Sequence, residues 1–161
     1  MAISNDEFRA ALSRFASGVT VVTSKDKEER MHGITVSAFC SVSLDPPLIL
    51  ICVEKTTGSH FALERSEAFV VNVLSVSQGE ISERFASMLP DKFDGVDFRP
   101  GIDGIPNLLG CLVNMECRLT DFYDGGDHTI FVGQVENAAF FDGDPLLYFR
   151  SDYRLIANHG I

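Results

Sequence analysis

The sequence predicts a mainly β fold, a barrel or a sandwich that carries a few short helices. About seven segments are rich in β-branched and aromatic residues and have the length of strands, and most are joined by short turns. These strands do not alternate with helices as a parallel α/β sheet requires. With 161 residues, the chain fits one domain that spans residues 1–161.

The N-terminal residues have the clearest helical pattern. Ser4 and Glu7 have the spacing of a capping box and precede an apolar stripe at helical spacing. The stripe consists of Phe8, Ala11, Leu12 and Phe15. Gly18 is the expected end of this helix. Short helices are also predicted at residues 57–63 and 77–86.

Strand patterns recur along the rest of the chain. They cover residues 19–24, 31–43, 48–53, 68–74, 108–123, 128–141 and 145–150. The charged turn at residues 25–30 is expected to join the first two strands as a hairpin. The third strand is expected to be fully buried because its apolar run is continuous. Residues 87–107, rich in Pro and Gly, are expected to form an irregular segment that packs down onto the fold.

Charge restricts the partners that this chain can bind. Thirteen Lys and Arg residues against 23 Asp and Glu residues give a formal net charge of −10. Nucleic acids and anionic membranes need a cationic protein surface, so neither is an expected partner. No apolar run approaches the roughly 20 residues of a membrane-spanning helix.

The cysteines are expected to be reduced thiols. Cys40, Cys52, Cys111 and Cys117 form no C-x-x-C motif, and the acidic start of the chain does not resemble a signal peptide. A cytoplasmic protein is therefore expected. The histidines have no metal-ligand spacing among themselves or with the cysteines, so no metal is expected.

Residues 31–43 hold the most informative side-chain pattern. From Thr35 to Ser43, every second position is Thr, Ser, Phe, Ser and Ser. In an unbroken strand these side chains share one face. A face of hydroxyls with one aromatic ring suits a planar ligand that has a polar edge. An exposed edge strand whose hydroxyls face water explains the pattern as well, and the residues alone leave both interpretations open.

Two other places could meet an anionic or aromatic ligand. Lys55 precedes the predicted helix at residues 57–63, whose first N–H groups would suit a phosphate. An ordinary helix cap beside a solvated lysine is the alternative. His128 follows Gly126 and Asp127 at the start of a predicted strand, where Asp127 could orient the imidazole or raise its pKa. A turn aspartate beside an exposed histidine is the simpler interpretation.

Six stretches, in order along the chain, resemble the short-chain flavin reductases. This family comprises the reductase components of two-component flavin-dependent monooxygenases, such as the 4-hydroxyphenylacetate and phenol hydroxylase reductases. The stretches are residues 15–23, 33–47, 69–74, 84–86, 126–133 and 145–150. Val36 and Ser37 depart from the family, which often has Ala-Asn there. The likeness runs from about Phe8 to Leu155.

The resemblance implies a split β-barrel homodimer that binds FMN or FAD and takes hydride from NADH or NADPH. The hydroxyl-bearing segment would then be one wall of the flavin site. The implied flavin contacts are Thr35, Ser37, Ala38, Ser41, Val42, Ser43, Cys52, Lys55, Ser59, His60 and Phe85. The implied nicotinamide-nucleotide contacts are Asp127, His128, Arg150 and Tyr153, with His128 positioning the nicotinamide.

The function that the resemblance implies is an NAD(P)H:flavin oxidoreductase that supplies reduced flavin to a partner monooxygenase. The two cofactors carry the hydride chemistry, so no side chain has to act as an acid or base in that step. One alternative is a flavoprotein that reduces another acceptor, such as ferric iron or a corrin. The other is a non-catalytic flavin-binding module, which would need no nicotinamide contact.

Overall fold

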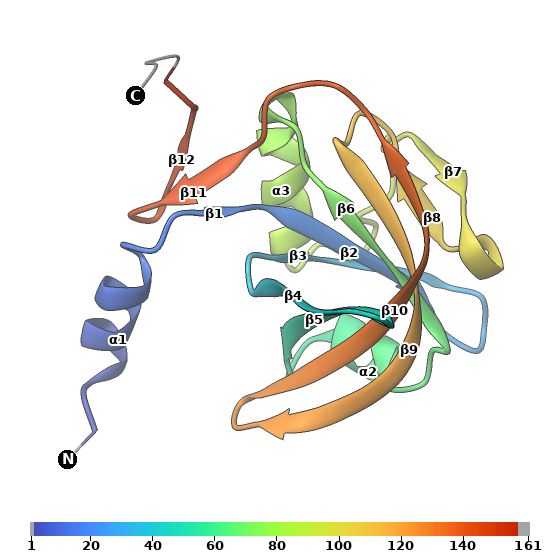
Figure 1. Cartoon of the computed structure of the whole chain (residues 1–161), viewed down its shortest axis with the longest axis horizontal. Helices are drawn as coiled ribbons and strands as arrows, with labels where there is room; N and C mark the ends of the chain where they lie inside the picture. The colour runs from blue at the N-terminus through green and yellow to red at the C-terminus, as the bar shows by residue number, and fades with distance from the viewer. Residues whose placement is uncertain (1, 158–161) are drawn as a thin grey trace.

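The structure, a computed structural model, describes residues 2–157 and is built on a seven-stranded antiparallel sheet (Figure 1). The order of the strands across this sheet is β3-β2-β6-β9-β10-β5-β4. Their bounds are β2 Thr20–Lys25, β3 Met31–Val36, β4 Phe39–Leu44, β5 Pro47–Glu54, β6 Ala68–Val73, β9 Val113–Gly125 and β10 His128–Phe140. The predicted hairpin of β2 and β3 is confirmed.

The two edge strands of this sheet, β3 and β4, follow each other in the chain. Only Ser37 and Ala38 separate them, and two residues span roughly 7 Å at most. The sheet must therefore curl until its edges approach each other at this connection. Within residues 2–157 no ladder joins β3 to β4, so the sheet is open rather than closed into a barrel. The prediction of a mainly β fold with short helices is confirmed.

Smaller elements surround the main sheet. Strands β1 (Ser17–Gly18), β11 (Leu147–Phe149) and β12 (Asp152–Arg154) form one small sheet, and β7 (Phe98–Pro100) pairs with β8 (Pro106–Leu108). The helices are α1 Asn5–Leu12, α2 Gly58–Leu63 and α3 Gly79–Ala86, with short 3-10 helices η1 Val76–Gln78 and η2 Ile102–Gly104. Residues 87–107 pack down as predicted, since Phe93 lies against buried Phe85.

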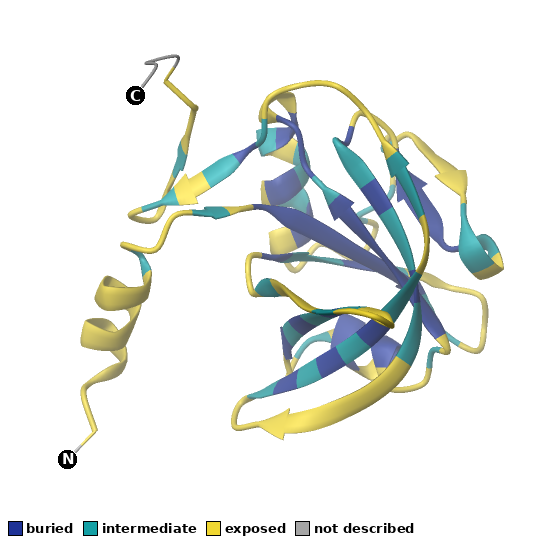
Figure 2. Ribbon diagram, in the orientation of Figure 1, coloured by how far each residue is buried: buried dark blue, intermediate teal, exposed yellow. Residues whose placement is uncertain are grey.

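The core lies inside the curl of the main sheet (Figure 2). Strand β5 contributes Ile49, Ile51 and Val53 to it, whereas Leu50 and Cys52 on the opposite face are only half-buried. The prediction of a fully buried strand at residues 48–53 is therefore wrong. In an antiparallel sheet one face packs on the core while the other is left open, even when every residue is apolar.

Helix α1 projects from the body of the protein (Figures 1 and 2). Its predicted capping box is confirmed, because the Glu7 backbone N–H donates to Ser4 Oγ and the Ser4 backbone N–H donates to Glu7 Oε2. The helix ends at Leu12, so the prediction that it ends at Gly18 is wrong. Gly18 lies in β1 and pairs with Leu147 of β11. No residue of α1 is buried.

Within residues 2–157, no helix is both long and apolar enough to cross a membrane. The same part of the chain contains no group of three or more His, Cys, Asp or Glu side chains placed to hold a metal ion.

Candidate functional site

The predicted face of hydroxyls is divided between the two edges of the main sheet. Thr35 lies on β3, whereas Ser41 and Ser43 lie on β4 at the other edge. An irregularity of the β4–β5 ladder between Ser41 and Ser43 disturbs the alternation again. The expectation of one continuous face is wrong, because side chains alternate regularly only while a strand and its ladder continue.

A hollow of about 530 Å³ lies beside this break, between the segment that holds α1 and strands β4 and β5. We call it the arm hollow. Its walls are Arg9, Leu12, Ser13, Phe15, Ser17, Ser37, Ala38, Phe39, Cys40, Leu50, Cys52, Tyr148 and Ser151. Three of the predicted flavin contacts, Ser37, Ala38 and Cys52, are thus brought together in one place.

Two smaller hollows lie along the fold from the arm hollow, each sharing wall residues with the next. Ser37 and Tyr148 also line a hollow of about 180 Å³, the linking hollow, which includes Thr35. Ala86 lines both this linking hollow and a third hollow of about 220 Å³, the loop hollow, under residues 85–93. Neighbouring hollows thus share wall residues, and the three together are called the row.

The hydroxyl groups of two residues that line the linking hollow, Thr35 and Tyr153, both donate hydrogen bonds to Ser82 of α3. Thr35 Oγ1 donates to the Ser82 carbonyl oxygen over 2.6 Å, and the Tyr153 hydroxyl donates to Ser82 Oγ over 2.8 Å. These bonds tie β3 and β12 to the same turn of α3. Tyr153, a predicted nicotinamide contact, therefore lies beside Thr35, a predicted flavin contact.

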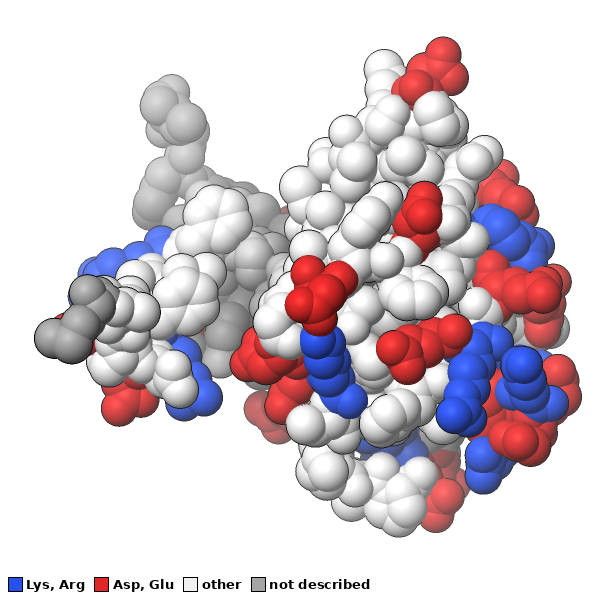
Figure 3. Space-filling model, turned by 90° about the horizontal axis from the view of Figure 1, so that it is seen from below, with Lys and Arg blue, Asp and Glu red and all other residues white. Residues whose placement is uncertain are grey.

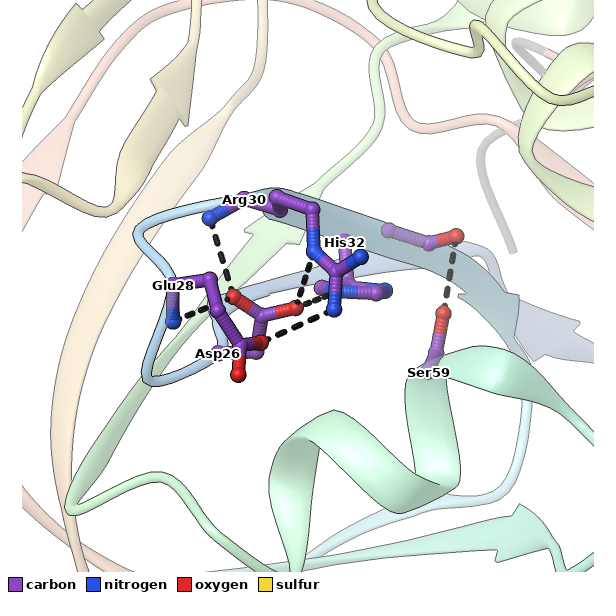
Figure 4. Close-up of polar contacts among 6 residues, drawn as sticks. Asp26, Glu28, Arg30, His32 and Ser59 are labelled. Atoms are coloured by element: carbon purple, nitrogen blue, oxygen red, sulfur yellow. Dashed lines mark hydrogen bonds and ion pairs between the residues drawn. The ribbon is translucent and has the colours of Figure 1, made fainter.

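The loop hollow contains two more predicted flavin contacts, Ser59 and Phe85. Ser59 Oγ donates to the Gly33 carbonyl oxygen over 3.1 Å, as Figure 4 shows. The Phe85 side chain is wholly buried and lies against Gly33. At Gly33, strand β3 therefore contributes only backbone to this part of the row.

A charged cluster in the turn before β3 lies next to the loop hollow (Figure 4). His32 Nε2 lies 2.9 Å from Asp26 Oδ2, and Arg30 Nε donates to the same oxygen over 2.8 Å. The hydrogen bond with His32 holds the pKa of Asp26 far below its usual value, with Arg30 adding to the effect. Since His32 also lines the loop hollow, this cluster fixes one of its walls.

His128 lies on the same face of the sheet as Cys52. In the ladder between β10 and β5, His128 pairs with Glu54 and Ile130 pairs with Cys52. Cross-strand partners share a face, as do residues two apart on one strand, so His128 and Cys52 are diagonal neighbours. His128 Nδ1 lies 2.8 Å from Asp127 Oδ1, which lowers the pKa of Asp127 and leaves His128 Nε2 available to a ligand.

Comparison with family models identifies the family of this chain. Residues 12–157 match the flavin reductase like domain. The chain belongs to the flavin reductase-like family. The family expected from the sequence motifs is thus confirmed, and so is the prediction of an oxidoreductase that acts on a flavin and a nicotinamide nucleotide.

Curated relatives and solved structures of flavin reductases support the assignment. The reductase subunit HsaB of a flavin-dependent monooxygenase from Mycobacterium tuberculosis is 40% identical over 149 residues, which cover 91% of this chain and 79% of HsaB. The FMN reductase (NADH) SmoA of Agrobacterium fabrum is 44% identical over 141 residues, covering 88% and 80%. The NADH:FAD oxidoreductase SgcE6 of Streptomyces globisporus, solved with NAD and FAD fragments, has a TM-score of 0.90 at 35% identity and 98% coverage of each chain.

Two of the flavin contacts predicted for this reductase are engaged elsewhere. Lys55 Nζ contacts the Asp124 carboxylate and donates to the Gly126 carbonyl oxygen over 2.6 Å, so it holds the tip of the β9–β10 hairpin. The expectation of a free cation at Lys55 is therefore not met. His60 is buried, with Nε2 2.7 Å from Thr129 Oγ1.

The other predicted contacts lie outside the three hollows. Ser41 and Val42 are exposed and Ser43 is half-buried along the edge strand β4. Arg150 is exposed, and its guanidinium carbon lies 5.4 Å from the centre of the Phe149 ring. Their roles in the flavin reductase stay predictions based on the family.

Sequence reasoning missed most residues of the row, among them Tyr148 and Lys92. Tyr148 lines both the arm hollow and the linking hollow, and Lys92 lines the loop hollow. Tyr148 lies in a short predicted strand and Lys92 in the irregular segment, where no local pattern indicates which way a side chain points. Only the tertiary arrangement brings them to the site.

Proposed function

We propose that this flavin reductase transfers hydride from NADH or NADPH to FMN or FAD and passes the reduced flavin to a flavin-dependent monooxygenase. The arm hollow is the observation that carries this proposal, since it gathers Ser37, Ala38 and Cys52 with His128 on the adjoining sheet face. The printed functions of HsaB, a monooxygenase reductase subunit, and SmoA, an NADH-dependent FMN reductase, support it.

The arm hollow suits a flavin ring in size and in chemistry. Its volume of about 530 Å³ lies within the usual range for small-molecule sites. Leu50 and Tyr148 offer apolar and aromatic surface for a planar ring, and the Ser37 hydroxyl offers a hydrogen bond to a polar edge. A bound flavin supplies the hydride acceptor, and a bound nicotinamide nucleotide supplies the hydride.

The side chains of the site serve to bind and orient. Asp127 holds the His128 imidazole through Nδ1, so that Nε2 keeps one direction for a bound nicotinamide nucleotide. Thr35 and Tyr153 are both tied to Ser82, which keeps the linking hollow in shape between the two nucleotides. Orientation of this kind lowers the entropic part of the barrier for hydride transfer.

The proposal includes a homodimer with the split-barrel arrangement of the family. The apolar stripe of α1 and of the turn after it faces solvent in the single chain, with Phe8, Leu12 and Phe15 respectively 55%, 54% and 78% exposed. In Figure 3 charged side chains occur on the arm and across this face and are densest at the end opposite the arm. A second copy that covered the stripe would remove this apolar surface from water and complete the wall of the arm hollow.

The proposed setting is the cytoplasm. All four cysteines are free thiols in the structure, as expected for a reducing compartment.

Steady-state oxidation of NADH or NADPH by the purified protein tests the proposal. The assay is run without flavin and with riboflavin, FMN or FAD. Oxidation that depends on added flavin supports the proposal. Oxidation through a retained flavin that ignores added flavin would indicate a reductase of another acceptor. Absence of oxidation under every condition would indicate a flavin-binding module.

A further inference from the structure

The turn that carries Asp127 belongs to the exposed tip of the β9–β10 hairpin, yellow in Figure 2. Residues 120–127 are all exposed, and His128 is half-buried. Thr129 is the first buried residue of β10, with 4% of its surface exposed. The hairpin tip therefore enters the core at Thr129, directly beside the imidazole that the proposed function places at the nicotinamide nucleotide.

His60 of α2 makes a buried side-chain contact at this point. Its Nε2 lies 2.7 Å from Thr129 Oγ1, and only 3% of His60 is exposed. The Glu64 carboxylate is 3.8 Å from the same nitrogen, beyond hydrogen-bond distance, and Nδ1 has no partner within residues 2–157. The imidazole also packs edge-on against Phe131, with 5.5 Å between the ring centres. Both contacts fix α2 to the inner face of β10.

The same part of the chain, residues 55–60, also holds the turn from its exposed side. The Lys55 backbone N–H donates to the Asp127 carbonyl oxygen over 3.0 Å, and Lys55 Nζ donates to the Gly126 carbonyl oxygen over 2.6 Å. The residues immediately before and after His128 are thus both tied to this segment. Because Thr129 is the tie on the core side, the loss of its hydrogen bond would free one side of His128.

We propose that His60 is a positioning residue for hydride transfer, which acts through Thr129 to hold His128 toward the nicotinamide nucleotide. This inference rests on the proposed function, since it requires His128 to contact that nucleotide. A group that orients a reactant must itself be held by packing and hydrogen bonds, because the reacting atoms meet only in a narrow range of distances. His60 needs no contact with the flavin in this role, and it lines none of the three hollows.

Removal of the hydrogen bond from each side tests the inference. Thr129→Val keeps the size of the side chain and removes its hydroxyl, and His60→Phe keeps an aromatic ring against Phe131. We expect each variant to raise the KM for NADH about 3- to 10-fold, the effect of one hydrogen bond. The dissociation constant for FMN, measured by quenching of flavin fluorescence, should change less than about twofold. Thr129→Ser keeps the hydroxyl and should have a KM close to that of the parent.

Thr23→Val is the matched control for the loss of a buried hydroxyl. Thr23 Oγ1 donates to the Pro106 carbonyl oxygen over 2.6 Å. It lies on β2, which β6 and β9 separate from β10 in the order of the sheet. Its replacement should lower the melting temperature and leave the KM for NADH unchanged.

A double-mutant cycle separates positioning from general damage to the fold. If His60 and Thr129 act on hydride transfer through His128, Thr129→Val should add nothing to the KM of His128→Ala. Additive effects in this cycle, or an unchanged KM in the single variants, would overturn the inference. So would a selective loss of FMN affinity in His60→Phe, which would make His60 a flavin contact.

Thermal melting shows whether each variant is folded at the assay temperature, and His60→Phe takes the place of Thr129→Val in the cycle if the latter is not. Failure of the proposed function is a separate outcome, because the parent protein would then show no flavin-dependent oxidation of NADH.

Discussion

Gly33 and Phe85 lie so close together that no larger residue fits between β3 and α3. A Cβ atom built on Gly33 would lie 2.5 Å from Phe85 Cδ1 and closer still to Cε1. The same close approach lets the Gly33 carbonyl oxygen accept hydrogen bonds from Ser59 and Lys92. Gly33 thus affects both the packing of β3 against α3 and the shape of the loop hollow.

Gly33→Ala should destabilise the protein by about 1–3 kcal/mol, because the added Cβ would force the buried Phe85 ring to move. Urea denaturation measures the loss. Gly18→Ala is the matched control, since a Cβ there would meet no atom within 4 Å. A Phe85→Leu change in the Gly33→Ala background should recover part of the loss. Equal stability of Gly33→Ala and the parent would contradict the packing described here.

His128→Ala should raise the apparent KM for NADH and leave the flavin dissociation constant unchanged. The reason is that His128 lies on the same sheet face as Cys52, which lines the arm hollow, whereas His128 itself does not line it. Steady-state kinetics with varied NADH, together with flavin titration, measure the two effects separately. Asp127→Asn should give a smaller shift in the same direction, because it weakens the bond that orients the imidazole. A normal KM for NADH in His128→Ala would remove this residue from the nicotinamide site.

Features set by neighbouring residues could be predicted from the sequence. Ser4 and Glu7 cap α1 as their spacing requires, and Thr57 caps α2 by accepting a hydrogen bond from the His60 backbone N–H. Both features arise within a few residues of chain. The family could also be predicted from its motifs, because these depend only on the order of residues along the chain and not on the tertiary fold.

Features set by the curl of the sheet could not be predicted. Neither Gly nor Pro marks the break at Ser37 and Ala38, which the change of sheet edge imposes. Lys92 reaches the Gly33 carbonyl group across 59 residues of sequence, and Lys55 meets Asp124 across 69. Local patterns therefore did not show which groups these two lysines engage, because both contacts arise only in the tertiary fold.

Lys55→Met should leave the ratio of FMN to riboflavin affinity unchanged. Its ammonium is engaged by Asp124 and by the Gly126 carbonyl oxygen at the hairpin that leads to His128. Loss of these contacts should loosen the hairpin and raise the KM for NADH. Flavin titration and steady-state kinetics of the same variant measure both quantities. A selective loss of FMN affinity would instead restore Lys55 as the phosphate cation expected from the sequence.

The four thiols should react at very different rates. Burial raises the pKa of Cys111 to about 11 and of Cys117 to about 12, whereas Cys40 is exposed. Thiolates are the reactive form, so at about pH 8 a disulfide reagent should label Cys40 first and spare the two buried thiols until the protein unfolds. Absorbance of the released thiol follows the reaction, and Cys40→Ser should abolish its fast phase. Added flavin should slow labelling, because Cys40 and Cys52 line the arm hollow. Fast labelling of Cys117 in the folded protein would contradict its burial.

Leu12→Glu should convert the proposed homodimer into a monomer. Leu12 lies in the middle of the exposed apolar stripe of α1 and also lines the arm hollow, so a charge there would oppose both burial in an interface and binding of a ring. Light scattering after size exclusion gives the mass of the parent and the variant. Ala10→Glu, on the opposite side of the helix, is the control and should leave the mass unchanged. If the parent is already a monomer at the concentrations used in the assay, α1 does not pair with a second copy, and the arm hollow must bind its flavin with the walls of one chain alone.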